Sequence, residues 1–328
     1  MTEPMKQQIR CPHRVYRLLW LRAVCVWRLR YGYGNGTMNS RDAALIASVV
    51  AVWGINFFFM KIALDELPPM LLGMLRFLLV LFPAVWWVKR PQTAWTWLVL
   101  YGLSISFGQF ALMFTALDLG LPTGLAALLV QVQVFFTVLV SAVFFREPVC
   151  LQHLWGMAAA AVGLLLIGVG HYQGTLPLSA LLAVLGAGAS WAVGNITVKH
   201  IGRVSPLALV VWGSVSAFAA FAAASLYLYG GSGIVNHIGN LSIKGVAGVV
   251  FLAYCSSLIG YTAWGSVLSR HPAGKVTPFA LLVPVFALVV GYVVLNERLG
   301  IWHWAGMGIV MAGLALHIFG IPSRRKRQ

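Results

Sequence analysis

Ten apolar stretches separated by short polar connections dominate the hydrophobic pattern of this chain from residue 43 onward. Each is 19 to 27 residues long, which suffices for a helix to cross a hydrocarbon core of ~30 Å. The predicted spans are Ala43–Ile62, Met70–Val88, Thr93–Leu117, Thr123–Phe145, Leu151–Gly170, Leu178–Val198, Ser205–Tyr229, Ile243–Ser269, Gly274–Leu295 and Ile301–Phe319. The pattern therefore predicts an all-α integral membrane protein with ten transmembrane helices.

The sequence also contains an internal repeat. Trp53, Lys61 and Pro68 recur 138 residues later as Trp191, Lys199 and Pro206. Six further pairs recur at an offset of 150: Pro122 with Pro272, Gly124 with Gly274, Glu147 with Glu297, His153 with His303, Gly156 with Gly306, and Gly163 with Gly313. The change of offset implies an insertion of about a dozen residues in the second copy, which residues 226–240 can supply, and such periodicity points to two diverged copies of one unit.

Each copy has an odd number of spans, so the second copy must start from the opposite side of the membrane. We expect a first five-helix repeat over residues 38–171, a second over 172–320 and a basic tail over 321–328. Inverted repeats of this kind are typical of secondary transporters, whose substrate sites lie near the midplane between the halves. The repeated glycines at positions 156, 163, 306 and 313 are small residues that let helices approach closely.

Composition agrees with a membrane location. Hydrophobic residues make up 60% of the 328 positions and charged residues 9%, and the net charge is +16. The bases lie mainly between the apolar runs, which makes a nucleic-acid-binding surface implausible as their explanation. With the N-terminus inside, 19 Lys and Arg lie on the cytoplasmic side and 3 on the other, or 12 and 3 without residues 1–37. Both termini are therefore predicted to be cytoplasmic.

Residues 1–37 form a basic N-terminal extension with seven Lys and Arg and one acid, Glu3. Its apolar run from Leu18 to Leu29 is interrupted by Arg22 and Arg28, so it is a poor signal-peptide core. A basic arm on the membrane surface and a transit-like peptide are two interpretations. We favour a third, in which Met38 is the true start of translation.

Arg76 lies inside the second predicted span. A charge at the bilayer centre costs roughly 2.5 to 3.5 kcal/mol on insertion scales, so the guanidinium is expected to face a cavity or a partner. A structural role, with the side chain bound to backbone carbonyls or reaching an interface, is the alternative. Lys61 and Lys199 each close a copy of the repeated motif. Lys199 is expected to anchor a helix end, whereas Lys61 could also reach a cavity mouth.

Uncharged amides at membrane depth either join helices or line a watery cavity. Gln131 and Gln133 are about 200° apart on a regular helix, so we expect only one of them to face a given cavity. The aromatic residues of the repeated motif and of the eighth span can offer ring faces to a substrate ammonium, although packing is the commoner role of such rings. The candidate substrate-binding residues are Trp53, Asn56, Arg76, Gln109, Gln131, Trp191, Asn195, Tyr261 and Trp264.

Catalytic chemistry has little support in the sequence. Glu147 and Glu297 are expected to form ion pairs at helix ends, and Asp118 near a helix end is the only weak candidate for a carboxylate proton relay. No phosphate-binding loop, HExxH or GxSxG motif occurs. The four cysteines lack metal-site spacing, so neither a metal nor a cofactor is expected. A membrane enzyme or a scaffold without flux is the weaker alternative.

Seven segments carry a family resemblance: WGINFFFMKIALDELPP, MLRFLLVLFPA, YGLSISFGQFALMF, GLPTGLAALLVQVQVFFT, SWAVGNITVKHI, LLVPVFALVVG and LNERL. Together they resemble the EamA branch of the drug/metabolite transporter superfamily over residues 38–319. Pro148 after Glu147 departs from the Glu-Arg pair kept at Glu297 and Arg298. The resemblance implies ten helices in two inverted repeats, alternating access, and a central cavity lined mainly by helices 1, 3, 4, 6, 8 and 9.

The resemblance also implies export of small amino-acid metabolites across a bacterial inner membrane, with cysteine and O-acetylserine as the first candidates. A broader amino-acid or drug exporter of the same fold is the alternative. The expected partners are a small-molecule substrate, the lipid bilayer and a second copy of the chain in a homodimer, with no nucleic acid. Arg76 is the predicted donor to a substrate carboxylate.

Overall fold

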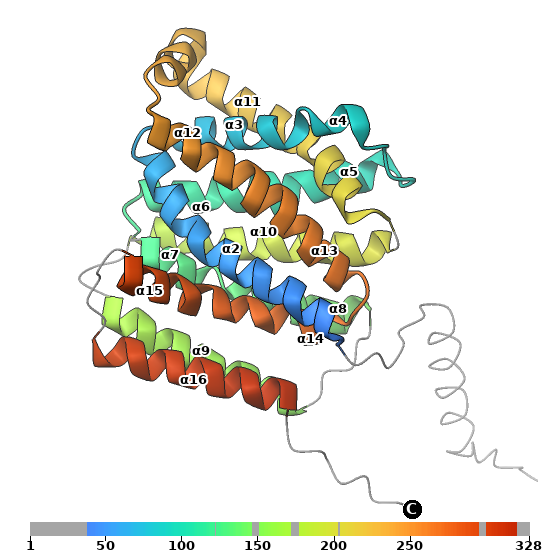
Figure 1. The fold of residues 1–328 in the computed structure, drawn as a ribbon, viewed down its shortest axis with the longest axis vertical. Coiled ribbons are helices and arrows are strands. Elements are labelled where there is room, and N and C mark those ends of the chain that lie inside the picture. Colours follow the sequence, from blue (N-terminus) through green and yellow to red (C-terminus); the bar gives the residue numbers. More distant parts are fainter. Residues whose placement is uncertain are drawn as a thin grey trace, which may run out of the picture. The chain divides into compact units, whose positions relative to one another are not determined.

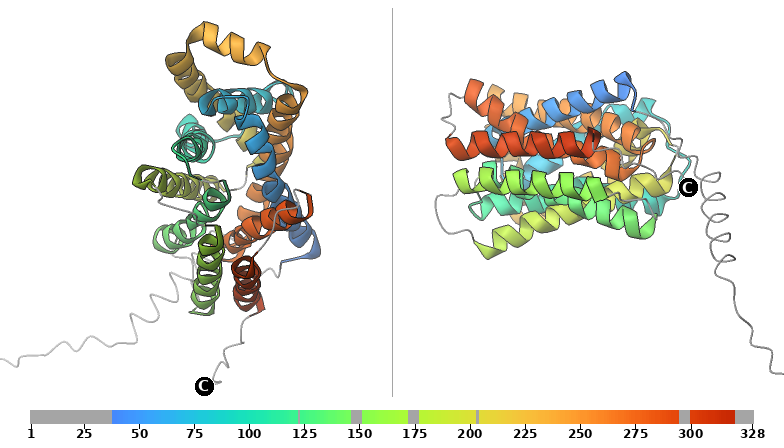
Figure 2. Two further views of the ribbon diagram at one scale, coloured as in Figure 1. Left: turned by 90° about the vertical axis from the view of Figure 1, so that its left-hand side faces the viewer. Right: turned by 90° about the horizontal axis from the view of Figure 1, so that it is seen from below.

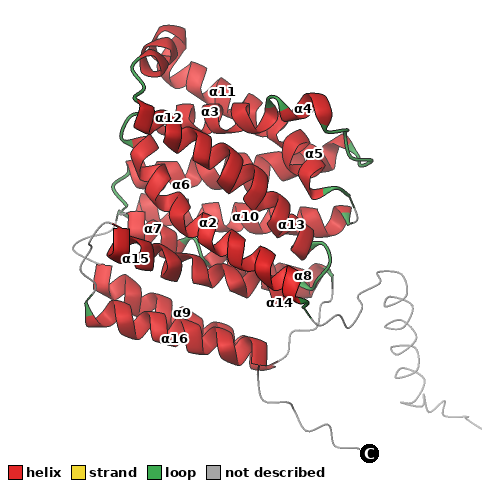
Figure 3. Cartoon of the chain, viewed as in Figure 1, coloured by secondary structure: helices red, strands yellow, loops and turns green. Residues whose placement is uncertain are grey.

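Helices make up nearly all of the chain in the computed structural model, which describes residues 38–121, 123–145, 151–171, 177–202, 204–294 and 300–319. No strand occurs among these residues (Figure 3). Residues 1–37, the tail over 321–328, and the predicted ion-pairing residues Glu147 and Glu297 lie outside the described residues. The all-helical fold class predicted from the apolar pattern is confirmed for the described part of the chain.

Eight helical segments are long and apolar enough to cross a membrane. They are α2 (Ser40–Leu64), α3 with α4 (Pro69–Leu81, Ala84–Trp87), α5, η1 and α6 (Trp95–Tyr101, Gly102–Gly108, Gln109–Asp118), α7 and α8 (Thr123–Leu129, Val132–Phe144), α10 (Leu178–Ile201), α11 (Pro206–Gly239), α12, η2 and α13 (Ile243–Val250, Phe251–Tyr261, Thr262–Leu268), and α14, η3 and α15 (Ala273–Val276, Thr277–Leu281, Leu282–Val294). Figure 1 shows these segments in sequence colours.

Two more helices, α9 (Leu151–His171) and α16 (Ile301–Phe319), lie where the fifth and tenth spans are predicted. Their described apolar parts, Leu154–Val169 and Ile301–Leu316, are shorter than the other eight. Ten crossings, the inverted orientation and the repeat boundaries at 171 and 172 therefore stay predictions.

Most of the long segments, numbered from here on by the predicted spans that they occupy, are not regular α-helices throughout. In the second, Phe82 and Pro83 separate α3 from α4. The third and eighth contain the π-helical stretches η1 and η2, and the ninth contains the 3-10 stretch η3. In the fourth, Val130 and Gln131 form a turn between α7 and α8. Pro278 lies in η3 and lacks the N–H that a continuous α-helix would use. Non-α backbone of this kind is tolerated at membrane depth where protein or a cavity surrounds it.

The segment predicted to supply the insertion, residues 226–240, continues α11 as far as Gly239. Gly230 has φ 64° and ψ 172°, a conformation that only glycine adopts readily, and the helix bends there before continuing to Gly239. The predicted span ends at Tyr229, so its end matches the bend.

Helices α9 and α16 pack along each other, as the views from the side and from below both show (Figure 2). A Cβ on Gly163 would lie 2.6 Å from the carbonyl oxygen of Gly306, and a Cβ on Gly313 would lie 2.7 Å from that of Gly156. The two backbones lie so close at these positions that there is no room for any side chain larger than that of glycine. The prediction that the repeated glycines permit close helix approach is confirmed, and the two copies supply them to each other.

A charged cluster joins three segments at the end of the bundle where α2 begins. Asp42 is buried and its two carboxylate oxygens lie 2.9 Å from Arg270 Nη2 and 2.8 Å from His271 Nε2. Lys199 Nζ donates to the carbonyl oxygen of His271 at 3.2 Å. The predicted anchoring role of Lys199 is thus confirmed. Lys61, by contrast, is exposed.

A second contact joins segments at the opposite end of α2. Glu66 accepts hydrogen bonds from the Ser242 hydroxyl at 2.6 Å and the Ser242 backbone N–H at 2.8 Å. Ser242 is also the N-cap of α12. These bonds, the hydroxyl bond first, hold the pKa of the Glu66 carboxyl below its ordinary value. The contact therefore persists at neutral pH and weakens only in acid, as pH falls through that lowered pKa.

An Asp42→Asn substitution is expected to lower the melting temperature of the purified protein. It removes a buried carboxylate from Arg270 and His271, but Arg270 keeps access to water with 46% of its side chain exposed. The cost should lie between the ~1 kcal/mol of an exposed pair and the about 3–5 kcal/mol of a buried one. Asp65→Asn, an exposed acid at the other end of α2, is the control. Equal melting temperatures for the two variants would contradict this.

Candidate functional site

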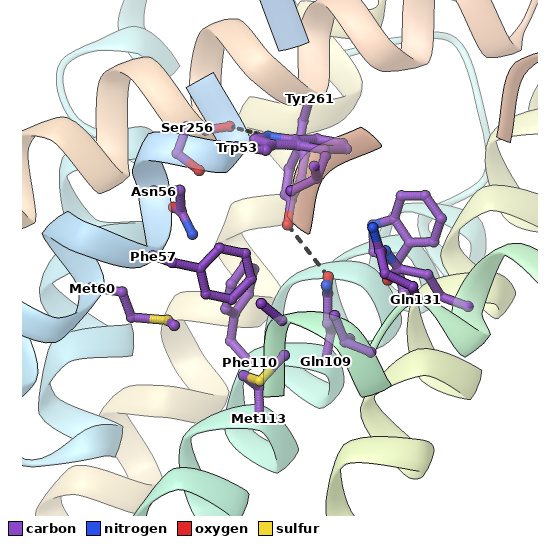
Figure 4. Close-up of a pocket in the computed structure, with 15 residues that line it drawn as sticks. Trp53, Asn56, Phe57, Met60, Gln109, Phe110, Met113, Gln131, Ser256 and Tyr261 are labelled. Atoms are coloured by element: carbon purple, nitrogen blue, oxygen red, sulfur yellow. Dashed lines mark hydrogen bonds between the residues drawn. The ribbon is translucent and has the colours of Figure 1, made fainter. Parts of the chain in front are cut away.

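A cavity of about 60 Å³ lies in the middle of the described bundle. Because one water molecule needs ~10–15 Å³ on this measure, the cavity has room for several water molecules or for one small metabolite. It is lined by Trp53, Asn56, Phe57, Met60, Gln109, Phe110, Met113, Ala127, Val130, Gln131, Gln133, Trp191, Ser256, Tyr261 and Val283 (Figure 4). These residues come from the first, third, fourth, sixth, eighth and ninth segments, the six that the family resemblance implies.

Aromatic rings close the cavity on the side where α2 begins. The Trp53 ring lies 6.2 Å from Trp191, 5.5 Å from Tyr261 and 5.3 Å from Trp264, measured between centroids. Asp42 precedes Trp53 by eleven residues, or about 16 Å along the helix. The other residues of α2 that line the cavity follow Trp53 in the sequence, and the last of them is Met60. The aromatic cluster therefore separates the cavity from the charged cluster around Asp42.

The rings of this cluster contact one another, which is the packing role anticipated for them. Polar atoms of two of these rings are also hydrogen-bonded: Trp53 Nε1 donates to the backbone oxygen of Ser256 at 3.1 Å, and the Tyr261 hydroxyl donates to Gln109 Oε1 at 3.4 Å. These bonds connect the eighth segment to the first and third. A role for the ring faces in binding an ammonium stays a prediction.

Gln131 and Gln133 both line the cavity, so the prediction that only one of them could do so is wrong. The estimate of 200° assumes a regular helix, whereas the turn at Val130 and Gln131 interrupts the fourth segment. Gln133 Nε2 donates to Gln131 Oε1 at 3.0 Å, and Gln131 Nε2 donates to the backbone oxygen of Ala280 in η3. The two amides form one chain that ends on the ninth segment.

Arg76 is fully buried directly behind the cavity wall. Its Nε donates to Ser257 Oγ at 2.7 Å and its Nη2 to Ser256 Oγ at 3.2 Å, while its Cζ lies 3.9 Å from the Phe110 ring centroid. Among the described residues, Nη1 has no hydrogen-bond partner and no carboxylate pairs with the guanidinium. Ser256 and Phe110 line the cavity, so a single layer of side chains separates this unpaired cation from it.

Two other predicted site residues, Asn195 and Trp264, do not line the cavity. Asn195 is completely buried; its Oδ1 accepts from Trp264 Nε1 at 3.1 Å and its Nδ2 donates to Thr137 Oγ1 at 3.3 Å. The pair thus ties α10 to α13 and α8. Asp118, named as a weak relay candidate, is exposed at the end of α6.

Several lining residues escaped the sequence analysis. Phe57, Met60, Phe110, Met113 and Val283 are apolar residues within apolar runs, and nothing in the sequence distinguishes them from lipid-facing ones. The adjacent Ser256 and Ser257 were a usable signal, because two hydroxyls in succession are unusual in so apolar a span. No group of three or more His, Cys, Asp or Glu that could hold a metal occurs in the described part of the chain.

Comparison with known proteins identifies the family. The model of the EamA-like transporter family matches residues 42–169 and again residues 178–319. The chain belongs to the EamA-like transporter family. It is therefore a multi-pass membrane transporter and not an enzyme.

Individual relatives of the EamA-like transporter family cover nearly the whole chain. A probable amino-acid metabolite efflux pump of Salmonella typhimurium is 40% identical over 293 residues, which are 88% of this chain and 98% of that protein. A protein of the same description from Escherichia coli is 36% identical over the same shares. A solved crystal structure with 20% identity superposes with a TM-score of 0.70 over 85% of this chain and 96% of that one, which supports the fold alone.

Proposed function

We propose that this protein exports small amino-acid metabolites across the bacterial inner membrane, with cysteine and O-acetylserine as its first candidate substrates. The observation that carries the proposal is the small cavity, lined by uncharged amides and backed by the unpaired Arg76 cation. The two relatives called probable amino-acid metabolite efflux pumps add support, because they align over almost their full length.

Alternating access between two inverted repeats is the proposed mechanism. The family model matches the chain twice. Irregular helical segments also occur at equivalent positions of the two matched parts. The third and eighth segments contain π-helix, and the fourth and ninth are interrupted. These correspondences support repeats over residues 38–171 and 172–320. The excess of Lys and Arg in alternate connections supports a cytoplasmic location for both termini. The aromatic cluster and the charged cluster around Asp42 would then close the cavity toward the cytoplasm.

Uptake into inverted membrane vesicles tests the function, because export appears there as accumulation. Vesicles containing the protein should accumulate labelled cysteine or O-acetylserine faster than vesicles lacking it, and unlabelled substrate should compete. Accumulation that unrelated amino acids compete equally well would favour the broader exporter. An inserted protein that accumulates neither compound, nor any other amino acid, would refute the proposal.

A further inference from the structure

The hydrogen-bond chain on the fourth segment leaves one acceptor for a ligand. Ala280 offers a backbone oxygen, which can only accept, so Gln131 must present its NH₂ group to it. The oxygen of Gln131 then receives the NH₂ group of Gln133 at 3.0 Å. Gln133 Oε1 remains, and this buried oxygen has no partner among the described residues. A buried acceptor without a donor is costly. Because Gln133 lines the cavity, a ligand N–H that packs against its side chain can satisfy this oxygen.

The eighth segment presents the complementary group. The Ser257 hydroxyl has no proton left for a ligand, because it donates to the carbonyl oxygen of Leu252 at 2.9 Å and accepts from Arg76 Nε. The Ser256 hydroxyl accepts from Arg76 Nη2, but no acceptor for its own proton occurs among the described residues. Because Ser256 lines the cavity, this proton can be donated to a ligand there. A bond from a cation strengthens the hydroxyl as a donor, and an anion is the acceptor it favours.

The two groups belong to different walls of one cavity. In Figure 4, Ser256 and Gln131 are labelled on opposite sides of the pocket, with the Tyr261–Gln109 hydrogen bond between them. Gln133 is hydrogen-bonded to Gln131 and so belongs to the same wall as Gln131. Met60 and Met113 line the space toward the far end of α2 and suit a short apolar or sulfur-containing side chain.

We propose that Ser256 and Gln133 determine the orientation of the substrate: Ser256, polarised by Arg76, donates to the carboxylate, and Gln133 Oε1 accepts from the ammonium. Arg76 is then a positioning residue that acts through Ser256. This inference rests on the proposed function for the nature of the substrate, and it adds which group of a zwitterion meets which wall. It makes Gln133 and Ser256 the residues that discriminate free amino acids from blocked ones.

Binding to the purified full-length protein tests this orientation, because it does not depend on transport. The probes are O-acetylserine, its methyl ester, which lacks the carboxylate charge, and its N-acetyl derivative, which lacks the ammonium. Apparent affinities come from the ligand-induced rise in melting temperature. The wild-type protein should bind the free compound at least about tenfold more tightly than either derivative, the effect of one charge-assisted hydrogen bond.

The two variants should lose different preferences. Ser256→Ala should bind the free compound and the methyl ester about equally while still rejecting the N-acetyl derivative. Gln133→Met should accept the N-acetyl derivative and still reject the ester. Ser214→Ala, whose buried hydroxyl donates within α11 to Val210 at 2.7 Å, is the matched control and should keep both preferences.

Three results would overturn the orientation: exchanged preferences, an equal loss for all three probes in both variants, or no binding of the free compound to the wild type. The proposed function fails separately. Binding with the expected preferences but no vesicle accumulation would keep the orientation and refute export. Accumulation with unchanged preferences in both variants would keep export and refute the orientation.

Discussion

A Gly102→Ala substitution is expected to cost the protein at least about 5 °C in melting temperature and much of its yield. Gly102 begins η1, where the third segment packs against α11. A Cβ at this position would overlap the carbonyl oxygen of Gly213 and the hydroxyl of Ser216. The serine can rotate, but the Gly213 oxygen belongs to a helical backbone, so the two helices would have to separate. Overpacking of this kind costs typically 1–3 kcal/mol, and more where backbone must move.

Gly308→Ala supplies the matched control for this prediction. Gly308 also lies within a helix, but a Cβ there would meet no atom within 4 Å. Alanine in a helix interior is preferred to glycine by up to about 1 kcal/mol, so this variant should keep or slightly raise the melting temperature. The measurement is thermal unfolding of both proteins in the same detergent. A Gly102→Ala protein as stable as Gly308→Ala would show that the contact between η1 and α11 is not close.

An Arg76→Met variant is expected to lose transport while remaining folded. Arg76 donates to Ser256 and Ser257, and no carboxylate among the described residues compensates its charge. Burying an unpaired charge is costly, and an apolar residue of similar length avoids this cost while it gives up the bonds to the two serines, so the melting temperature should change little. Transport should fall by at least about tenfold, because the substrate carboxylate loses a polarised donor.

The companion variants separate charge from structure. Arg76→Lys keeps the charge but loses the planar fork that reaches both serines, so an intermediate transport rate is expected. Arg41→Met removes an exposed charge at the start of α2 and should transport normally. Initial rates in inverted vesicles and melting temperatures of the same proteins are the measurements. If Arg76→Met unfolds more readily but transports normally per folded molecule, Arg76 is a structural residue without a part in substrate binding.

The structure also shows which predictions failed and why. Sequence reasoning identified Trp53 because it belongs to the repeated motif, and Asn56 and Gln109 because they are amides in apolar spans; all three line the cavity. It failed for Gln133, because the turn at Val130 and Gln131 has neither glycine nor proline to reveal it. Pro278, which lies in η3, is a signal of the irregularity in the ninth segment that the sequence analysis did not use. No comparable signal marks η2, where Ser256 and Tyr261 lie.

The sequence by itself determined the membrane class, the positions of the apolar spans, the repeat and the glycines of the helix contact. These follow from local properties: apolar length, the placement of charges, and the recurrence of small residues at constant offsets. Only the tertiary structure decided which polar groups share the cavity. The free acceptor of Gln133 depends on Ala280, and the free proton of Ser256 depends on Arg76, 180 residues away. A hydrogen-bond vacancy is a property of all the partners together, so no single stretch of sequence could reveal it.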